Sequence, residues 1–243
     1  MDPTSLRIDL SDFPTPKSGG RPGKKRHRPD PSAKGMLFRC VRWSILLLVL
    51  GVLPFFTLLR VSVFLLQEHG VHSWLALVGG ASATLLLLSS YLVAMSLRIG
   101  RKGRVPGAMV KGAGILVGAY CLLTLLYLSA GNAKTEEIRS TYTSLNPLLR
   151  VGVSTLLFLD GDVILTSTGR DLDEYSAWGL ATNPNSLHLP QEDGYVYAVD
   201  IRTMGRPEWR NRAVSVYFRA MGFETLRHVG TADHLHVYLL PPG

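Results

Sequence analysis

Three long apolar stretches constrain this chain more than any other feature of its sequence. They cover residues 44–66, 74–97 and 112–130, and the second and third contain no charged residue. A helix needs about 20 apolar residues to cross a hydrocarbon core of about 30 Å, and each stretch reaches or nearly reaches that length. The sequence therefore predicts three transmembrane helices, with the lipid bilayer as the first partner of the chain.

The basic residues lie on one side of these stretches. Residues 1–42 hold ten Lys and Arg against four Asp and Glu, and residues 98–111 hold five against none. Residues 131–243 hold ten basic against thirteen acidic residues. By the positive-inside rule the N-terminus is cytoplasmic, and the C-terminal segment is periplasmic or extracellular. We interpret the net charge of +8 as the topology signal of a multi-pass cytoplasmic (inner) membrane protein, and not as a nucleic-acid-binding surface.

The composition divides the chain into three parts. Residues 1–42 are rich in proline and glycine around a basic cluster, which predicts a disordered basic cytoplasmic tail. Residues 43–131 are the predicted three-helix transmembrane region. Residues 132–243 are of mixed polarity, and we expect three transmembrane α-helices to be followed here by an exported α+β domain with a small, mostly antiparallel sheet. Cys40 and Cys121 both lie outside this domain, so it is expected to fold without a disulfide.

Periodicity and turn residues predict the elements of the C-terminal domain. A polar helix is expected at residues 135–143, a second helix begins at Asn146-Pro147, and a third covers residues 209–221. Gly222 suits the left-handed residue that ends such a helix. Strands are expected at residues 163–165, 195–201, 225–228 and 235–240, with a turn at residues 160–162.

Four of the seven histidines lie in this domain, and two of them are spaced for one face of a strand. His234 and His236 are two residues apart, so both imidazoles point the same way if the segment is extended. Asp200 ends an apolar segment, where a carboxylate needs a partner because an unpaired buried charge is costly. Two histidines and one aspartate, with water in the fourth position, form a known catalytic zinc arrangement, and His188 can supply the remaining nitrogen.

A structural alternative accounts for the same residues without a metal. In that alternative Asp200 pairs with Arg170 or Arg202, and the histidines hydrogen-bond to their neighbours. His228 is assigned such a structural role, as a residue at the edge of a strand.

Four short segments also occur in a specific order. They are Leu165-Thr166-Ser167-Thr168-Gly169-Arg170, Ser186-Leu187-His188, Ala198-Val199-Asp200-Ile201 and Asp233-His234-Leu235-His236. Together they resemble the zinc-dependent D-alanyl-D-alanine dipeptidases and carboxypeptidases, which are relatives of the lysostaphin-type endopeptidases and of the hedgehog fold. The resemblance covers most of residues 145–240 and leaves the membrane part outside it.

The resemblance implies a metal site formed by His188, Asp200 and His236, which would hold zinc. The twelve positions from His188 to Asp200 are more than the family usually has. Residues 190–194 read as an inserted turn, and an insertion in a surface loop costs little.

The resemblance also implies roles for four further residues. Asp233 takes the place of the general base, and His234 that of a second base or transition-state stabiliser. Arg170 helps to bind the substrate or to polarise its carbonyl, and Ser186 belongs to the substrate-binding element. A carboxylate that accepts a proton and a guanidinium that pairs with a terminal carboxylate suit peptide hydrolysis.

The resulting expectation is a membrane-anchored zinc metallopeptidase that hydrolyses peptide bonds in cell-wall peptide stems, as a D-alanyl-D-alanine carboxypeptidase or dipeptidase does. Peptidoglycan would then be its partner outside the membrane. Two alternatives stay open. One is a catalytically inactive zinc- or peptidoglycan-binding sensor, and the other is a membrane scaffold that recruits a protein partner.

Overall fold

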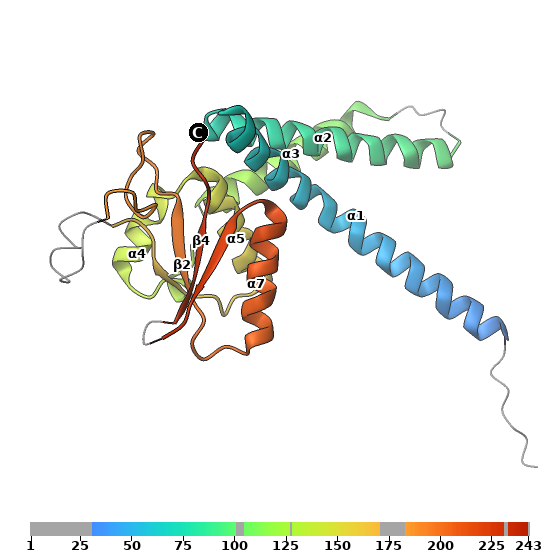
Figure 1. The fold of residues 1–243 in the computed structure, drawn as a ribbon. Coiled ribbons are helices and arrows are strands. Elements are labelled where there is room, and N and C mark those ends of the chain that lie inside the picture. The colour runs from blue at the N-terminus through green and yellow to red at the C-terminus, as the bar shows by residue number, and fades with distance from the viewer. Residues whose placement is uncertain (1–30, 101–104, 127, 171–182, 231–232, 243) are drawn as a thin grey trace, which may run out of the picture. The chain divides into compact units, whose positions relative to one another are not determined.

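The structure is a computed structural model that describes residues 31–100, 105–126, 128–170, 183–230 and 233–242 (Figure 1). It contains two compact units, Met1–Leu46 and Leu47–Gly243. The first includes the beginning of the first helix. The second holds the rest of the apolar helices together with the C-terminal domain. Residues 1–30 of the predicted tail lie outside the described residues.

Three long apolar helices form the N-terminal half of the described chain: α1 (Pro31–His69), α2 (Ser73–Arg98) and α3 (Gly107–Leu126). Each is long and apolar enough to cross a membrane, as predicted. The prediction of disorder was wrong for residues 31–42, which belong to α1. Proline suits the first turn of a helix, and no later proline interrupts the chain before the apolar stretch begins.

The C-terminal part is the predicted α+β domain with a small antiparallel sheet. Its helices are α4 (Glu136–Ser140), α5 (Pro147–Leu159) and α7 (Glu208–Met221), with short 3-10 turns at Ala130–Asn132 and Thr141–Ser144. Its strands are β1 (Leu165–Ser167), β2 (Ala198–Arg202), β3 (Glu224–His228) and β4 (His234–Tyr238). The strand order is β1-β2-β4-β3, and all neighbouring strands are antiparallel.

Two strands begin later than predicted, because residues outside the sheet bond to the backbone at the positions where these strands were expected to start. The side-chain amide of Asn132 donates to the carbonyl of Val163 at 2.8 Å, and the strand predicted at residues 163–165 starts at Leu165. The strand predicted from residue 195 starts at Ala198, because Val196 bridges to Leu145 instead. The polar helix predicted at residues 135–143 is divided between α4 and a 3-10 turn.

The two faces of the sheet have different roles. Thr225, Val237 and Val199 stand in register across three strands. Ser215 of α7 lies 2.8 Å from the hydroxyl of Thr225, so α7 covers this face. The residues between these positions, Asp200 among them, therefore project from the opposite face.

The C-terminal domain packs directly on the apolar helices. The guanidinium of Arg150 in α5 donates to the carbonyl oxygen of Leu125, near the end of α3, where helical carbonyls lack partners. The side-chain amide of Asn146 donates to the hydroxyl of Ser73, the first residue of α2, at 2.7 Å. Both contacts are buried, which ties α5 to two apolar helices.

Gly222 ends α7 in the left-handed conformation that the sequence predicted, with φ of 100°. A Cβ atom here would lie 2.5 Å from the guanidinium of Arg60 and 2.8 Å from a methyl group of Val63, both in α1. The position therefore requires glycine for its backbone conformation and for the space it leaves to α1.

Candidate metal centre

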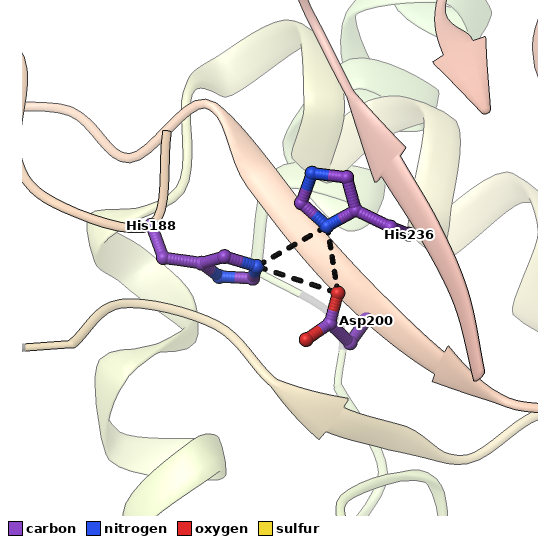
Figure 2. A group of neighbouring side chains, drawn as sticks. All are labelled: His188, Asp200 and His236. Atoms are coloured by element: carbon purple, nitrogen blue, oxygen red, sulfur yellow. Dashed lines mark hydrogen bonds and ion pairs between the residues drawn. The ribbon is translucent and has the colours of Figure 1, made fainter. Parts of the chain in front are cut away.

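Three side chains of metal-binding type converge on the sheet face opposite α7. Asp200 lies in β2 and His236 in β4, and the two residues are direct partners in the antiparallel register. His188 reaches the same point from the segment before β2 (Figure 2). The three residues come from one loop and two strands, and they are the metal ligands that the resemblance implied.

The separations of the facing atoms suit a shared ion. His236 Nδ1 lies 2.8 Å from Asp200 Oδ1, and His188 Nε2 lies 3.3 Å from each of those atoms. Tetrahedral ligands at zinc bond lengths of about 2.0–2.2 Å stand roughly 3.3 Å apart. The three side chains can therefore hold one metal ion together, and their ligand atoms all lie within 4.8 Å of one another.

The centre is shielded from solvent on its carboxylate side. Asp200 and His188 are buried, and His236 is half-buried. Burial alone would raise the pKa of Asp200, but hydrogen bonds from His188 and His236 and the nearby charges of His188 and His234 hold it below its usual range. The carboxylate is thus kept in the ionised form that binds metal.

A backbone contact fixes the orientation of His188. Its Nδ1 atom lies 2.6 Å from the carbonyl oxygen of Thr168, and a carbonyl can only accept. Nδ1 therefore carries a proton, and Nε2, the atom that faces Asp200, is the nitrogen left to bind a metal ion. The hydroxyl of buried Thr168 is held in turn by Thr141 at 2.6 Å. Neither threonine was given a role from the sequence, where Thr168 appeared only within the segment 165–170 that carries the resemblance.

Arg170 supports the carboxylate from its other side. Its Nη2 atom lies 3.2 Å from Asp200 Oδ2, and its Nε atom donates to the hydroxyl of Ser167 at 2.9 Å. The ion pair that the structural alternative expected is therefore present. It uses only Oδ2, so Oδ1 stays directed at His188 and His236.

His234 lies beside the centre without joining the triad. Its Nε2 atom is 3.7 Å from Asp200 Oδ1, and its ring stacks on that of His228 at a centroid distance of 4.7 Å. The stacking follows from the register, in which His228 and His234 are partners. His228, assigned only to a strand edge from the sequence, thus holds His234 in place. Tyr238 lies along the same strand face, with its ring 5.3 Å from that of His236.

The structure directs Asp233 elsewhere. Its Oδ2 atom forms an ion pair with Arg227 at 2.9 Å, and Arg227 is the register partner of Leu235. Arg227 also approaches Glu208 at the start of α7, with 3.8 Å between the charged atoms. Asp233 therefore lies toward the α7 side of the sheet, and not toward the face that carries the three ligands.

Ser186 stays in the loop that leads to His188. Its hydroxyl accepts a hydrogen bond from the backbone N–H of His188 at 3.4 Å, and its own N–H donates to the carbonyl of Asn183 at 3.1 Å. The residue shapes the turn before the ligand, and its role in substrate binding stays a prediction.

No protein-family model, curated protein or solved structure matches this chain. The family resemblance of residues 165–236 therefore stays a prediction. The metal centre rests on the geometry of its own residues, namely two imidazole nitrogens and one carboxylate oxygen directed at one point beside a guanidinium and a further imidazole.

Proposed function

We propose that the C-terminal domain is a zinc-dependent hydrolase of peptide bonds, held at the membrane by the three apolar helices. One observation carries the proposal: His188, Asp200 and His236 converge from three separate segments with ligand-atom separations of 2.8 to 3.3 Å. Two imidazole nitrogens and one carboxylate oxygen leave a fourth tetrahedral position, which distinguishes catalytic from structural zinc sites. The donor set suits zinc because borderline ions favour imidazole nitrogen combined with carboxylate oxygen.

The remaining polar groups suit catalysis around such an ion. A bound zinc ion supplies Lewis acidity, which polarises a carbonyl group and lowers the pKa of a water molecule. His234, whose Nε2 lies 3.7 Å from Asp200 Oδ1, is the group best placed to accept a proton beside the ligands. Arg170 orients Asp200 through its Nη2 atom, and the resemblance implies that it also binds the substrate.

The distribution of charge along the chain supports a substrate outside the cytoplasm. The excess of basic residues in segments 1–42 and 98–111 favours a cytoplasmic N-terminus and an exported C-terminal domain. A peptidase held there meets peptidoglycan peptide stems, the substrates implied by the resemblance. Fusion of alkaline phosphatase or of a green fluorescent protein after residue 243 tests this placement. Phosphatase activity without fluorescence is expected, and the reverse pattern would rule out an exported domain.

Metal content and turnover test the enzyme itself. The full chain, purified in a non-ionic detergent, should contain one zinc ion per chain, as measured by elemental mass spectrometry. It should also cleave synthetic stem peptides that end in D-alanyl-D-alanine. His236→Ala should lose both properties. His69→Ala, which removes an exposed histidine at the end of α1, is the matched control and should retain them. Zinc binding without cleavage of any stem peptide would reject the hydrolase.

A metal-dependent peptide receptor is the second candidate. The ion pair between Asp233 and Arg227 favours it, because the residue expected to act as general base is engaged on the other side of the sheet. This candidate predicts that stem peptides bind in proportion to zinc content and remain intact after long incubation. Cleavage that His234→Gln abolishes would decide for the enzyme.

A further inference from the structure

A pocket lined by three arginines opens at the N-terminal end of α7, apart from the metal centre. Its volume is about 240 Å³, and its arginines are Arg202, Arg206 and Arg210. None of the three metal-binding residues lines it. We call it the Arg206 pocket. Its capacity to bind a ligand does not depend on the proposed hydrolase activity.

Arg206 is buried with two of its nitrogens unused. Only 8% of its side chain is exposed, and its Nη2 atom forms an ion pair with Asp160, the residue that follows α5. Its Nε and Nη1 atoms are buried and have no hydrogen-bond partner among the described residues. Leaving charged donors unsatisfied in a buried position is costly, so the arrangement calls for an acceptor that the described residues do not provide.

A tight turn presents Arg206 to the pocket. The N–H of Arg206 donates to the carbonyl of Thr203 at 3.3 Å, and Gly205 adopts a positive φ of 79° between them. Asn211 of α7 donates to the same carbonyl at 3.2 Å. The turn is thus fixed to the helix whose first residues line the pocket.

The other two arginines complete a positive rim. Arg210 is about one-third exposed and pairs with Asp160 at 2.7 Å and with Asp162 at 2.9 Å. Arg202 is exposed, and no ion pair involves it in the part of the chain that the structure describes. Its guanidinium is therefore available to a ligand from solvent.

The backbone of α7 adds to the positive electrostatic potential of the pocket. Pro207 precedes the helix and provides no side-chain cap, so the first N–H groups of this 14-residue helix are not capped by a side chain. The acidic residue of the first turn, Glu208, approaches Arg212 at 3.6 Å and Arg227 at 3.8 Å. Neither of those arginines lines the pocket.

We propose that the Arg206 pocket binds a phosphoryl oxyanion, supplied as free phosphate or as the phosphate of a lipid headgroup. Guanidinium groups bind phosphate oxygens in pairs, and the N-terminus of a helix favours negative charge. Arg206 Nε and Nη1 are the central donors, and Arg202 closes the open side. Asp162 opposes binding, because its carboxylate occupies Arg210 at the rim.

Calorimetric titration of the full chain in a non-ionic detergent tests this site. The two probes are inorganic phosphate and glycerophosphoglycerol, the deacylated headgroup of an anionic phospholipid. Saturable binding of either supports the site, and at least tenfold tighter binding of one identifies the source. Arg202→Gln should weaken binding about tenfold, because a hydrogen bond to a charged group is lost. Arg212→Gln makes the same charge change on α7 outside the pocket, and it should change the dissociation constant by no more than about twofold.

Two further variants separate binding from folding. Arg206→Gln should weaken binding by more than about tenfold, because it removes both central donors. Asp162→Asn removes an exposed carboxylate and should tighten binding about threefold, an effect that a purely structural role does not produce. Thermal unfolding shows whether each variant is folded. If Arg206→Gln does not fold, the binding measured for Asp162→Asn and for Arg202→Gln decides the test. Failure of both anions to bind saturably, or equal weakening by Arg202→Gln and Arg212→Gln, would overturn the proposal.

Discussion

The Nδ1 atom of His188 lies 2.6 Å from the carbonyl oxygen of Thr168, and this contact decides which nitrogen of His188 faces the metal centre. Because the carbonyl has no proton, the imidazole must donate from Nδ1, which leaves Nε2 as the nitrogen that can bind a metal ion. Hydrogen bonds of this kind hold metal-ligating histidines in one tautomer and one orientation. A backbone carbonyl thus prepares a loop residue to bind together with two strand residues.

His188→Ala should lower the affinity for zinc by more than about 100-fold, since loss of a ligand exceeds the 10–100-fold typical of its supporting partners. His228→Ala is the matched control, because His228 is not one of the three ligands, although its ring stacks on His234 and lies 6.1 Å from that of His236. It should stay within about threefold of the wild type. Competition with a chromogenic chelator measures the zinc affinity of both variants, and an equal loss of affinity in the two would contradict the assignment of ligands.

Arg170→Gln should weaken zinc binding about 10–100-fold, because Asp200 loses the partner that orients its carboxylate. Arg202→Gln removes the same charge two residues beyond Asp200 on β2 and should have little effect. The comparison separates the two partners that the sequence left open for Asp200. An equal effect of both variants would show that net charge, and not the ion pair, supports the site.

His234→Gln should lower kcat by about 100-fold or more while zinc content is unchanged, as expected when a general base is removed. Asp233→Asn should change kcat far less, since its carboxylate pairs with Arg227 on the other side of the sheet. It should instead reduce stability by about 1 kcal/mol or less, the scale of a partly exposed ion pair. Steady-state kinetics on stem peptides measure this contrast, and loss of turnover only in Asp233→Asn would restore Asp233 as the base.

Gly222→Ala should destabilise the protein by about 1–3 kcal/mol, because any other residue is strained at its φ of 100°. The added Cβ would also press on Arg60 and Val63 of α1. Gly161→Ala, where a Cβ meets no atom within 4 Å, should change stability by less than about 0.5 kcal/mol. Unfolding in denaturant gives both values, and matching values would show that α1 does not constrain the end of α7.

Stability should fall as the pH rises through the alkaline range, because burial raises the pKa of Tyr142 to about 12 despite its hydrogen bond to Ser154. In the unfolded chain the phenol ionises near pH 10, so unfolding releases a proton between about pH 10 and 12. Tyr142 therefore contributes its full stabilisation below about pH 10 and loses it as the pH approaches 12. Tyr142→Phe should remove roughly 3 kcal/mol of this pH dependence. An unchanged slope of unfolding free energy between pH 10 and 12 would show that Tyr142 does not titrate in this way.

Several features of the protein follow from local patterns of residues alone. Long charge-free runs predict apolar helices because a hydrocarbon core demands them, and period-two spacing places His234 and His236 on one strand face. The candidate ligands were likewise marked by residue type and order. The predicted element bounds were less accurate at three places. The first helix already begins at residue 31, and two strands begin only at residues 165 and 198, because nonlocal contacts occupy the residues before them.

The way in which these segments meet follows from the folded structure and not from any local pattern. The register of β2 with β4 brings Asp200 to His236, and the Thr168 carbonyl turns His188 toward both. Asp233 was expected to lie beside the ligands, but it pairs with Arg227, because the alternation of a strand places residue 233 on the face of Leu235, opposite His234 and His236. Contacts between segments far apart in the chain depend on packing and loop geometry, which no local pattern of residues specifies.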